Sequence, residues 1–326
     1  MPTTRQSRSG SMQVWPRKRA RRHYPRVRAW AQRKDAALLG FAGYKVGMAH
    51  AMYTDNRKTS KTKGQDISCP ITIVECPPVK IMGARLYKKD SYGNHAFKDI
   101  IVNADKELKR KISVPKKKAE KELEGLSTDD VSDIKAIICT QPKLTGIGKK
   151  KPEIFEVGIG GDLNSKLEYL KQNLGKEIKI EDAFSPGQLL DIHAVTKGKG
   201  LQGPVKRFGI GLTSQKSEKK RRGPGSLGGW KGQGHFMYRI SSAGQMGCHT
   251  RTEYNKWVMK IASESKDIEE INPQKGFHRY GKIKNTFIII RGSVAGPSKR
   301  MVRINAALRD SKKIPKEAPS IQKIIV

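Results

Sequence analysis

The segment 196–252 most limits what this chain can fold into, because it has too few apolar residues to build a core. It contains 12 Lys or Arg residues, 13 Gly and a single acid, Glu218. Its apolar residues are scattered and repeat with neither helix nor strand period. Ordering a backbone costs about 1–2 kcal/mol per residue, and apolar burial cannot offset that cost here. Many contacts with phosphate groups can. We therefore expect a basic arm that becomes ordered on RNA, with Trp230 near its tip.

The charge of the whole chain also predicts a nucleic-acid partner. The 326 residues include 66 Lys or Arg and 30 Asp or Glu, which gives a formal net charge of +36. Solubility alone requires a net charge of only about 2–8 for a small domain. With a charge this large, the positive side chains repel one another unless an anionic partner neutralises them.

Cysteine usage and hydropathy predict a soluble protein of the reducing cytoplasm. Cys69, Cys76, Cys139 and Cys248 are isolated from one another, and none forms a CxxC pair. The chain shows no apolar core of a signal peptide and no run near the roughly 20 apolar residues of a membrane span.

The N-terminal segment is predicted to contact RNA. Residues 1–34 hold 11 Lys or Arg residues and no acid, and Trp15, His23 and Tyr24 are interleaved with them. Guanidinium groups bind phosphates through two hydrogen bonds, and flat rings stack on exposed bases. A nuclear-localisation tract or a disordered tail is the alternative interpretation.

Several short apolar runs predict a small closed β-barrel. Strands are expected within 38–53 and 70–87, and at 96–102, 189–196 and 286–294. Glycines and prolines between and within them mark bulges, corners and turns. Trp257 lies beside Val258 and Met259 and is expected in the core.

Residues 105–182 predict an acidic α/β insertion that faces away from RNA, since they contain 15 of the 30 acids. Leucines at 163, 167, 170 and 174 follow helical spacing, with Asp162 placed as N-cap and Gly175 as the stop. Residues 106–124 are also helical in character, although Pro115 must interrupt them.

Motifs for other functions are weak. Residues 198–203 match GxGxxG, but a dinucleotide site needs a helix starting in the glycines and a downstream acid, whereas Pro204 and basic residues follow here. His235, Cys248 and His249 lack a fourth metal ligand. No P-loop and no catalytic pattern occurs. We therefore expect no metal, no cofactor, no small-molecule substrate and no enzymatic activity.

With these motifs in place, the chain resembles the universal L-three family of large-subunit ribosomal proteins, in its archaeal form. The resemblance rests on GSMQVWPRKRA at 10–20, GFAGYKVGMAH at 40–50, ITIVECPP at 71–78, VTKGKGLQGPVKR at 195–207, GGW at 228–230 and AGQMGCHTRTE at 243–253. These blocks span most of the chain in the family's order.

The resemblance implies a barrel like that of translation elongation factors, with two basic non-globular extensions that reach through rRNA. It implies binding near the 3′ end of large-subunit rRNA, a role in nucleating subunit assembly, and an arm that carries Trp230 towards the peptidyl-transferase centre. It also implies neighbours of the ribosomal L-fourteen and L-twenty-four-e families. Eukaryotic relatives carry a histidine before the tryptophan where this chain has KSEKKRR at 216–222, so that histidine's role does not carry over.

These inferences define the predicted site and domains. The predicted rRNA-binding residues are Arg17, Lys18, Arg19, Arg21, Arg22, Lys197, Lys199, Lys206, Arg207, Arg221, Arg222, Trp230, His249 and Arg251. The predicted ranges are an N-terminal extension 1–37, barrel segments 38–104, 186–198 and 255–310, the insertion 105–185, the central arm 199–254 and a C-terminal tail 311–326. An RNA-modifying enzyme with a basic surface, and a free-standing RNA chaperone or DNA-compacting protein, are the alternatives.

Overall fold

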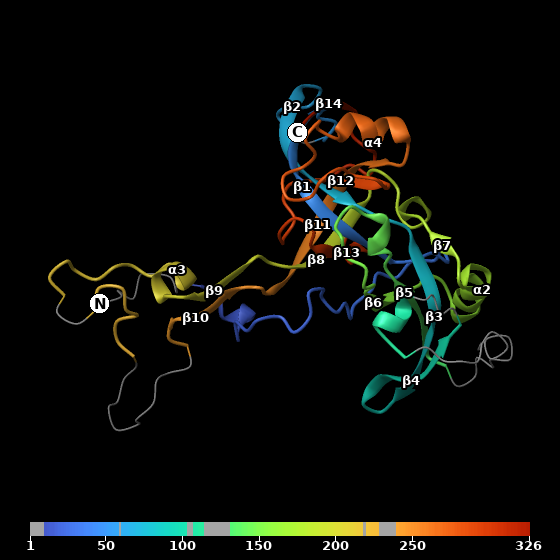
Figure 1. Cartoon of the computed structure of the whole chain (residues 1–326), viewed down its shortest axis with the longest axis horizontal. Helices are drawn as coiled ribbons and strands as arrows, with labels where there is room; N and C mark the ends of the chain where they lie inside the picture. Colours follow the sequence, from blue (N-terminus) through green and yellow to red (C-terminus); the bar gives the residue numbers. More distant parts are fainter. Residues whose placement is uncertain (1–9, 59, 103–106, 114–130, 218–219, 228–238) are drawn as a thin grey trace. The chain divides into compact units, whose positions relative to one another are not determined.

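The chain forms two compact units. The computed structural model describes residues 10–58, 60–102, 107–113, 131–217, 220–227 and 239–326. The smaller unit comprises 1–23 and 195–251, and the larger unit comprises 24–194 and 252–326. The described structure is mainly β, which confirms that part of the predicted fold class (Figure 1).

The main sheet of the larger unit has seven strands in the order β13-β8-β11-β12-β2-β1-β14 (Figure 1). Their bounds are β1 (Gly40–Thr54), β2 (Asp66–Glu75), β8 (Leu189–Val195), β11 (Thr250–Ala262), β12 (Phe287–Arg291), β13 (Met301–Ala306) and β14 (Ile321–Ile325). Strand β13, at one end of this order, also pairs with β1, so that Gly40 lies opposite Asn305.

Large apolar side chains fill the core against this sheet. Phe41, Tyr53, Trp257 and Phe287 are buried, and Ile288–Ile290 are inaccessible on both faces of β12, as expected for a central strand. The strands predicted at 189–196 and 286–294 are confirmed as β8 and β12. The core position of Trp257 is confirmed too, and its Nε1 donates a hydrogen bond to the Gly187 carbonyl oxygen at 3.1 Å.

A buried carboxylate ties the loop before β12 to the end of β2. Glu75 is inaccessible to solvent. It accepts hydrogen bonds from the Tyr280 hydroxyl, from the backbone N–H of Lys284 and from the backbone and side-chain amides of Asn285. Burial, followed by the charge of Glu75, raises the pKa of Tyr280, so the phenol stays a donor.

A second sheet of five strands covers part of the predicted barrel range and part of the predicted insertion. Its order is β4-β3-β5-β6, with β7 paired to β3. The bounds are β3 (Val79–Asp90), β4 (Gly93–Ile101), β5 (Asp133–Cys139), β6 (Ile154–Gly158) and β7 (Glu177–Ile178). Strands β3 and β4 lie in the range assigned from sequence to the barrel, yet they pair with the strands of the insertion. Strand β4 confirms the strand predicted at 96–102.

Helix α2 (Leu163–Asn173) confirms the leucine pattern. Leu167 and Leu170 are buried, and Gly175 follows the helix with a positive φ of 74°. Asp162 occupies the N-cap position but makes no side-chain capping hydrogen bond.

Residues 24–37, called the strap below, pack on the larger unit, although their basic composition predicts that they belong to the N-terminal extension. The Tyr24 hydroxyl donates to the Ile154 carbonyl oxygen at 3.1 Å. The ring of Trp30 fills the space beside Gly40 and Gly158, where a Cβ atom would lie 2.8 Å from the indole. Aromatic anchors in a basic segment therefore fix it to the protein.

The remaining described elements are short. They are η1 (Met12–Val14), η2 (Leu108–Arg110), η3 (Pro142–Leu144), η4 (Ile180–Asp182), β9 (Gly198–Gln202), α3 (Pro204–Phe208), β10 (Gly244–Gly247) and α4 (Ser265–Ile271). Most of the helix expected at 106–124 lies outside the described residues. The predicted surface tail 311–326 ends in β14, which pairs with β1. Within the described ranges, no helix is long and apolar enough to cross a membrane.

Candidate nucleic-acid interface

The predicted RNA-binding residues all belong to the smaller unit. Its described residues are 10–23, 195–217, 220–227 and 239–251, and they contain no Asp or Glu. Trp230 lies outside the described residues. Among the described residues of this unit, the cations therefore have no carboxylate to pair with.

A two-stranded ribbon forms the base of the central arm (Figure 1). Strand β9 pairs with β10 in antiparallel fashion, with Gln202 opposite Gly244 and Gly198 opposite Gly247. Gly247 has a φ of +72°, and a Cβ atom there would lie 2.0 Å from the Lys197 carbonyl oxygen. The glycines of the GxGxxG match thus lie in and just after a strand, and α3 begins only at Pro204. This is not the geometry of a dinucleotide-binding turn.

The N-terminal segment packs against α3 through one phenylalanine. The rings of Trp15 and Phe208 lie 5.7 Å apart between centroids. The guanidinium carbon of Arg17 lies 4.2 Å from the centre of the Phe208 ring, and its Nη1 donates to the Arg207 carbonyl oxygen at 3.0 Å. Phe208 is buried. Residues 10–23 of the predicted N-terminal extension and the described part of the central arm are therefore packed together in one unit.

Arg207 joins three segments of this unit. Its Nε donates to the Gln245 carbonyl oxygen at 3.0 Å, and its Nη1 donates to that of Ser242 at 2.9 Å. Its Nη2 lies 3.5 Å from the Arg17 carbonyl oxygen. Burial lowers the pKa of Arg207. The guanidinium groups of Arg17 and Arg207 thus hold the unit together, and their contact with phosphate stays a prediction.

His249 is also bonded inside the unit. Its Nδ1 lies 3.0 Å from the Lys18 carbonyl oxygen, which can only accept, so Nδ1 carries the proton. The backbone N–H of His249 donates to the Thr196 hydroxyl at 3.1 Å, and its carbonyl oxygen accepts from the Thr196 N–H at 2.9 Å. The neighbouring Cys248 carbonyl oxygen accepts from the Ala20 N–H at 2.8 Å. Nδ1 of His249 is thus used inside the unit, and contact of this ring with RNA stays a prediction.

Most of the other predicted cations are exposed. Those with exposed side chains are Lys18, Arg19, Arg21, Arg22, Lys197, Lys199, Lys206, Arg221 and Arg222. Arg251 is partly buried and donates to the Thr250 carbonyl oxygen at 2.9 Å. The unit therefore presents a cationic surface on a backbone fixed by a few internal contacts.

Hydrogen bonds also fix the turn that leads to Arg221. The Thr213 backbone N–H and hydroxyl donate to the Arg221 carbonyl oxygen at 3.1 and 3.0 Å. Sequence reasoning did not identify Thr213 or Phe208. The apolar Phe208 directly after Lys206 and Arg207 was the available signal, because a large ring in so polar a segment needs packing partners. Leu201 remains 78% exposed.

Comparisons with known proteins place the chain in a family. A family model described as ribosomal protein L3 matches residues 1–325. The chain is 46% identical to the large ribosomal subunit protein uL3 of Methanosphaera stadtmanae over 316 residues, covering 94% of this chain and 93% of that protein. It is 45% identical to the uL3 protein of Methanobrevibacter smithii, with the same coverage. Identity to the uL3 protein of Methanothermobacter thermautotrophicus is 43%, covering 98% of this chain and 96% of that protein.

Proposed function

The chain belongs to the ribosomal protein L3 family, the L-three family that its sequence resembles, and from this premise we propose that it is a structural rRNA-binding component of the large ribosomal subunit. It acts there in the cytoplasm as a binding protein and not as an enzyme. Its partners are large-subunit rRNA and neighbouring ribosomal proteins.

One observation carries this proposal: the described part of the smaller unit exposes many cations and contains no carboxylate. Each phosphate that Lys or Arg neutralises releases counterions, and this release supplies much of the affinity for RNA. The described part of the unit holds no carboxylate that would compete with phosphate for these cations. The contacts of Arg17, Arg207 and Phe208 hold the backbone in shape, so less ordering remains to be done upon binding.

We further propose the finer role that the resemblance implies. The smaller unit binds near the 3′ end of the rRNA, nucleates assembly and carries Trp230 towards the peptidyl-transferase centre. Proteins of the L-fourteen and L-twenty-four-e families are its neighbours. The predicted domain ranges are part of the same proposal, except that residues 24–37 pack on the larger unit and β3 and β4 form one sheet with strands of the insertion.

The main sheet is proposed to be the small closed barrel that the sequence predicts, of the elongation-factor type. The pairing of β13 with β1 supports this, because β13 stands at the opposite end of the strand order. A closed sheet leaves few edges open to unwanted pairing.

The retention of the protein on salt-washed large subunits tests the proposal. A subunit component stays bound through washes that remove a free-standing RNA chaperone. The Trp230→Ala variant tests the arm: a stacked aromatic contributes about 1–3 kcal/mol, so assembly persists while peptidyl transfer and drug sensitivity change. Unchanged peptidyl transfer and drug sensitivity in normally assembled subunits would contradict the role of Trp230.

A further inference from the structure

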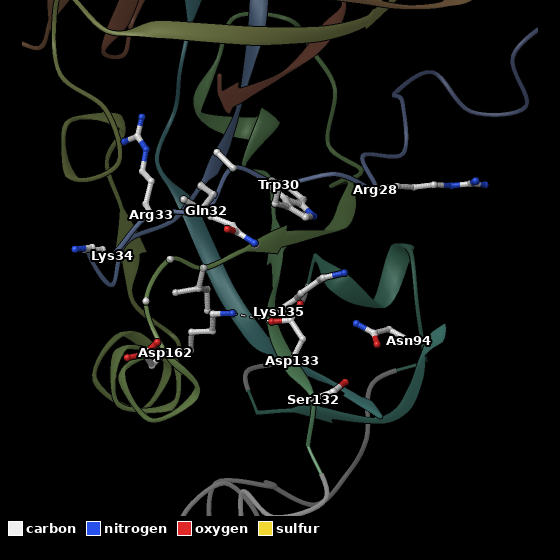
Figure 2. A pocket seen from close by; sticks show the side chains of 17 residues that line it. Arg28, Trp30, Gln32, Arg33, Lys34, Asn94, Ser132, Asp133, Lys135 and Asp162 are labelled. Atoms are coloured by element: carbon white, nitrogen blue, oxygen red, sulfur yellow. Dashed lines mark hydrogen bonds and ion pairs between the residues drawn. The ribbon is translucent and has the colours of Figure 1, made fainter. Parts of the chain in front are cut away.

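The larger unit contains a polar groove that the function proposed above leaves unused. Its volume is about 980 Å³, and it lies between the strap and the second sheet (Figure 2). The strap contributes Arg28, Trp30, Gln32, Arg33 and Lys34 to its lining. The opposite side is formed by Asn94, Ser132, Asp133 and Lys135, by the turn 158–162 and by Lys166 of α2.

The wall formed by the strap is anchored from within. Trp30 occupies the space that Gly40 and Gly158 leave free. The Arg303 guanidinium lies 4.3 Å from the centre of the Phe155 ring and 5.6 Å from that of Trp30. Its Nη1 donates to the Pro25 carbonyl oxygen at 3.3 Å, and burial lowers its pKa to about 10. The Gly161 N–H donates to the Arg33 carbonyl oxygen at 2.8 Å. The groove is therefore part of the folded unit.

The charge of the lining favours an anionic occupant. Its five cations are Arg28, Arg33, Lys34, Lys135 and Lys166, and its two carboxylates are Asp133 and Asp162, a difference of +3. Asp133 is already paired with Lys166 at 2.8 Å. Lys135 lies 4.0 Å from the centre of the Tyr87 ring. Among the described residues, no carboxylate forms an ion pair with Arg28, Arg33, Lys34 or Lys135.

The same lining carries groups that recognise bases. Gln32 and Asn94 present amides from opposite sides of the groove, as Figure 2 shows. Amides both donate and accept hydrogen bonds, which suits the edges of unpaired bases. Outside the lining itself, Tyr92 lies two residues before Asn94 in the turn between β3 and β4 and is 99% exposed. An aromatic ring this exposed can stack on a base.

We propose that this groove binds a short single-stranded segment of large-subunit rRNA, with its phosphates near the cations of the strap and a base stacked on Tyr92. A double helix is not the expected ligand, because pairing and stacking already occupy the edges and faces of its bases. The inference rests on the proposed function and extends it: the larger unit holds a second RNA site.

Site-directed hydroxyl-radical cleavage tests the groove directly. The four native cysteines are buried, so an iron chelate attached to Asn94→Cys reports from the groove alone. The labelled full-length chain is assembled into large subunits. Ser214→Cys, exposed in the smaller unit, is the positive control, and Glu269→Cys, exposed on the acidic helix α4, is the negative control.

The expected result is strong local rRNA cleavage from Asn94→Cys, at nucleotides different from those cut from Ser214→Cys. Cleavage from Ser214→Cys without cleavage from Asn94→Cys would overturn the groove site and leave the proposed function standing. A crosslink from position 94 to an acidic protein segment, without RNA cleavage, would overturn it in favour of a protein partner. No cleavage from either position would contradict the proposed function itself.

A charge-removal series gives a second, independent measurement. Arg28→Ala combined with Lys34→Ala leaves the anchors of the strap intact, and Lys266→Ala combined with Lys275→Ala is the matched control. For a single strand, the slope of log affinity against log salt falls by about 0.7 per lost phosphate contact. We expect a decrease of about 1.4 in the first variant and none in the control. Tyr92→Ala should weaken binding about tenfold. Equal slopes in both double variants would overturn the proposal.

Discussion

The two units of this molecule are stabilised in different ways. The larger unit has an apolar core around Trp257 and Phe287 and neutralises many of its cations internally, as Arg85 does with Asp99 and Glu156. The described smaller unit has one buried ring, Phe208, and backbone carbonyls in place of carboxylates as partners for Arg17 and Arg207. Because the described part of the smaller unit contains no carboxylate, we expect its cations to pair with an external anion, and the unit gains little stability from ion pairs among these residues.

The largest expected effect is on the core of the larger unit. Trp257→Ala removes a side chain that is 2% exposed together with its hydrogen bond to Gly187. We expect the free energy of unfolding to fall by about 3–5 kcal/mol, measured by urea unfolding of the full chain. Tyr92→Ala is the control and should leave it unchanged. A loss below about 1 kcal/mol would show that the core does not depend on Trp257.

Phe208→Ala should loosen the smaller unit alone. The ring contacts Trp15 and lies beside Arg17 and Arg207, so its loss should weaken the packing of the N-terminal segment by about 2 kcal/mol. Hydrogen exchange should then be faster at the Ala20 amide, which bonds to Cys248. Amides of β12 in the larger unit should keep their protection. Faster exchange in both units would show that the two units are not stabilised independently.

Trp257, the leucines of α2 and the strap show how much of the fold the sequence reveals. Trp257 was predicted in the core because apolar residues follow it, and the leucine spacing of 163–174 predicted α2. The strap was assigned to the RNA-binding extension because its four Arg and Lys residues continue the basic composition of the N-terminal segment. Its docking depends instead on Tyr24, which bonds to the Ile154 carbonyl oxygen, and on Trp30, which fills the space beside Gly158. Pairing of β3 and β4 with β5 and β6 is likewise a long-range choice that local apolar patterns do not specify.

At the candidate site too, the sequence predicts what depends on local composition and does not predict long-range contacts. Exposed cations such as Lys199 and Arg222 were predicted from composition alone. The internal roles of Arg17 and Arg207 were not, because an arginine that bonds to distant carbonyl groups has the same local sequence signal as one that faces solvent.

Removal of exposed cations should change RNA binding and leave stability unchanged. Arg221→Ala combined with Arg222→Ala should reduce the slope of log affinity for rRNA against log salt by about 1.4–1.8, at 0.7–0.9 per phosphate contact. Lys171→Ala combined with Lys179→Ala, two exposed positions of the larger unit, is the matched control. Filter binding across a salt series measures both. A slope that does not change would show that these arginines contact no phosphate.

Acid should affect the two units differently, and this is the smallest effect. Burial raises the pKa values of Glu153 and Glu156. Hydrogen bonds and charges outweigh this effect and lower both pKa values: at Glu153 they come from Lys149 and Lys111. At Glu156 they come from Tyr87 and Arg85. The contribution of both carboxylates to stability is therefore complete above the ordinary pKa of about 4.5 and is lost as the pH falls below it.

Hydrogen exchange at pH 5 and pH 3, corrected for intrinsic rates, measures this difference. Protection should decrease around β5 and β6 and stay constant at Ala20 and Thr196 of the smaller unit. Glu156→Gln should reduce the decrease around β6. Equal losses of protection in both units would show that the uneven distribution of carboxylates is not the cause of the acid effect.

Footprinting of naked large-subunit rRNA across a salt series tests the central claim most directly. The full chain should protect discrete nucleotides near the 3′ end and a second patch near the peptidyl-transferase centre, and both should persist at moderate salt. Deletion of residues 210–241 should remove only the second patch. Diffuse protection that disappears as salt is raised would contradict the account and indicate a non-specific polycation.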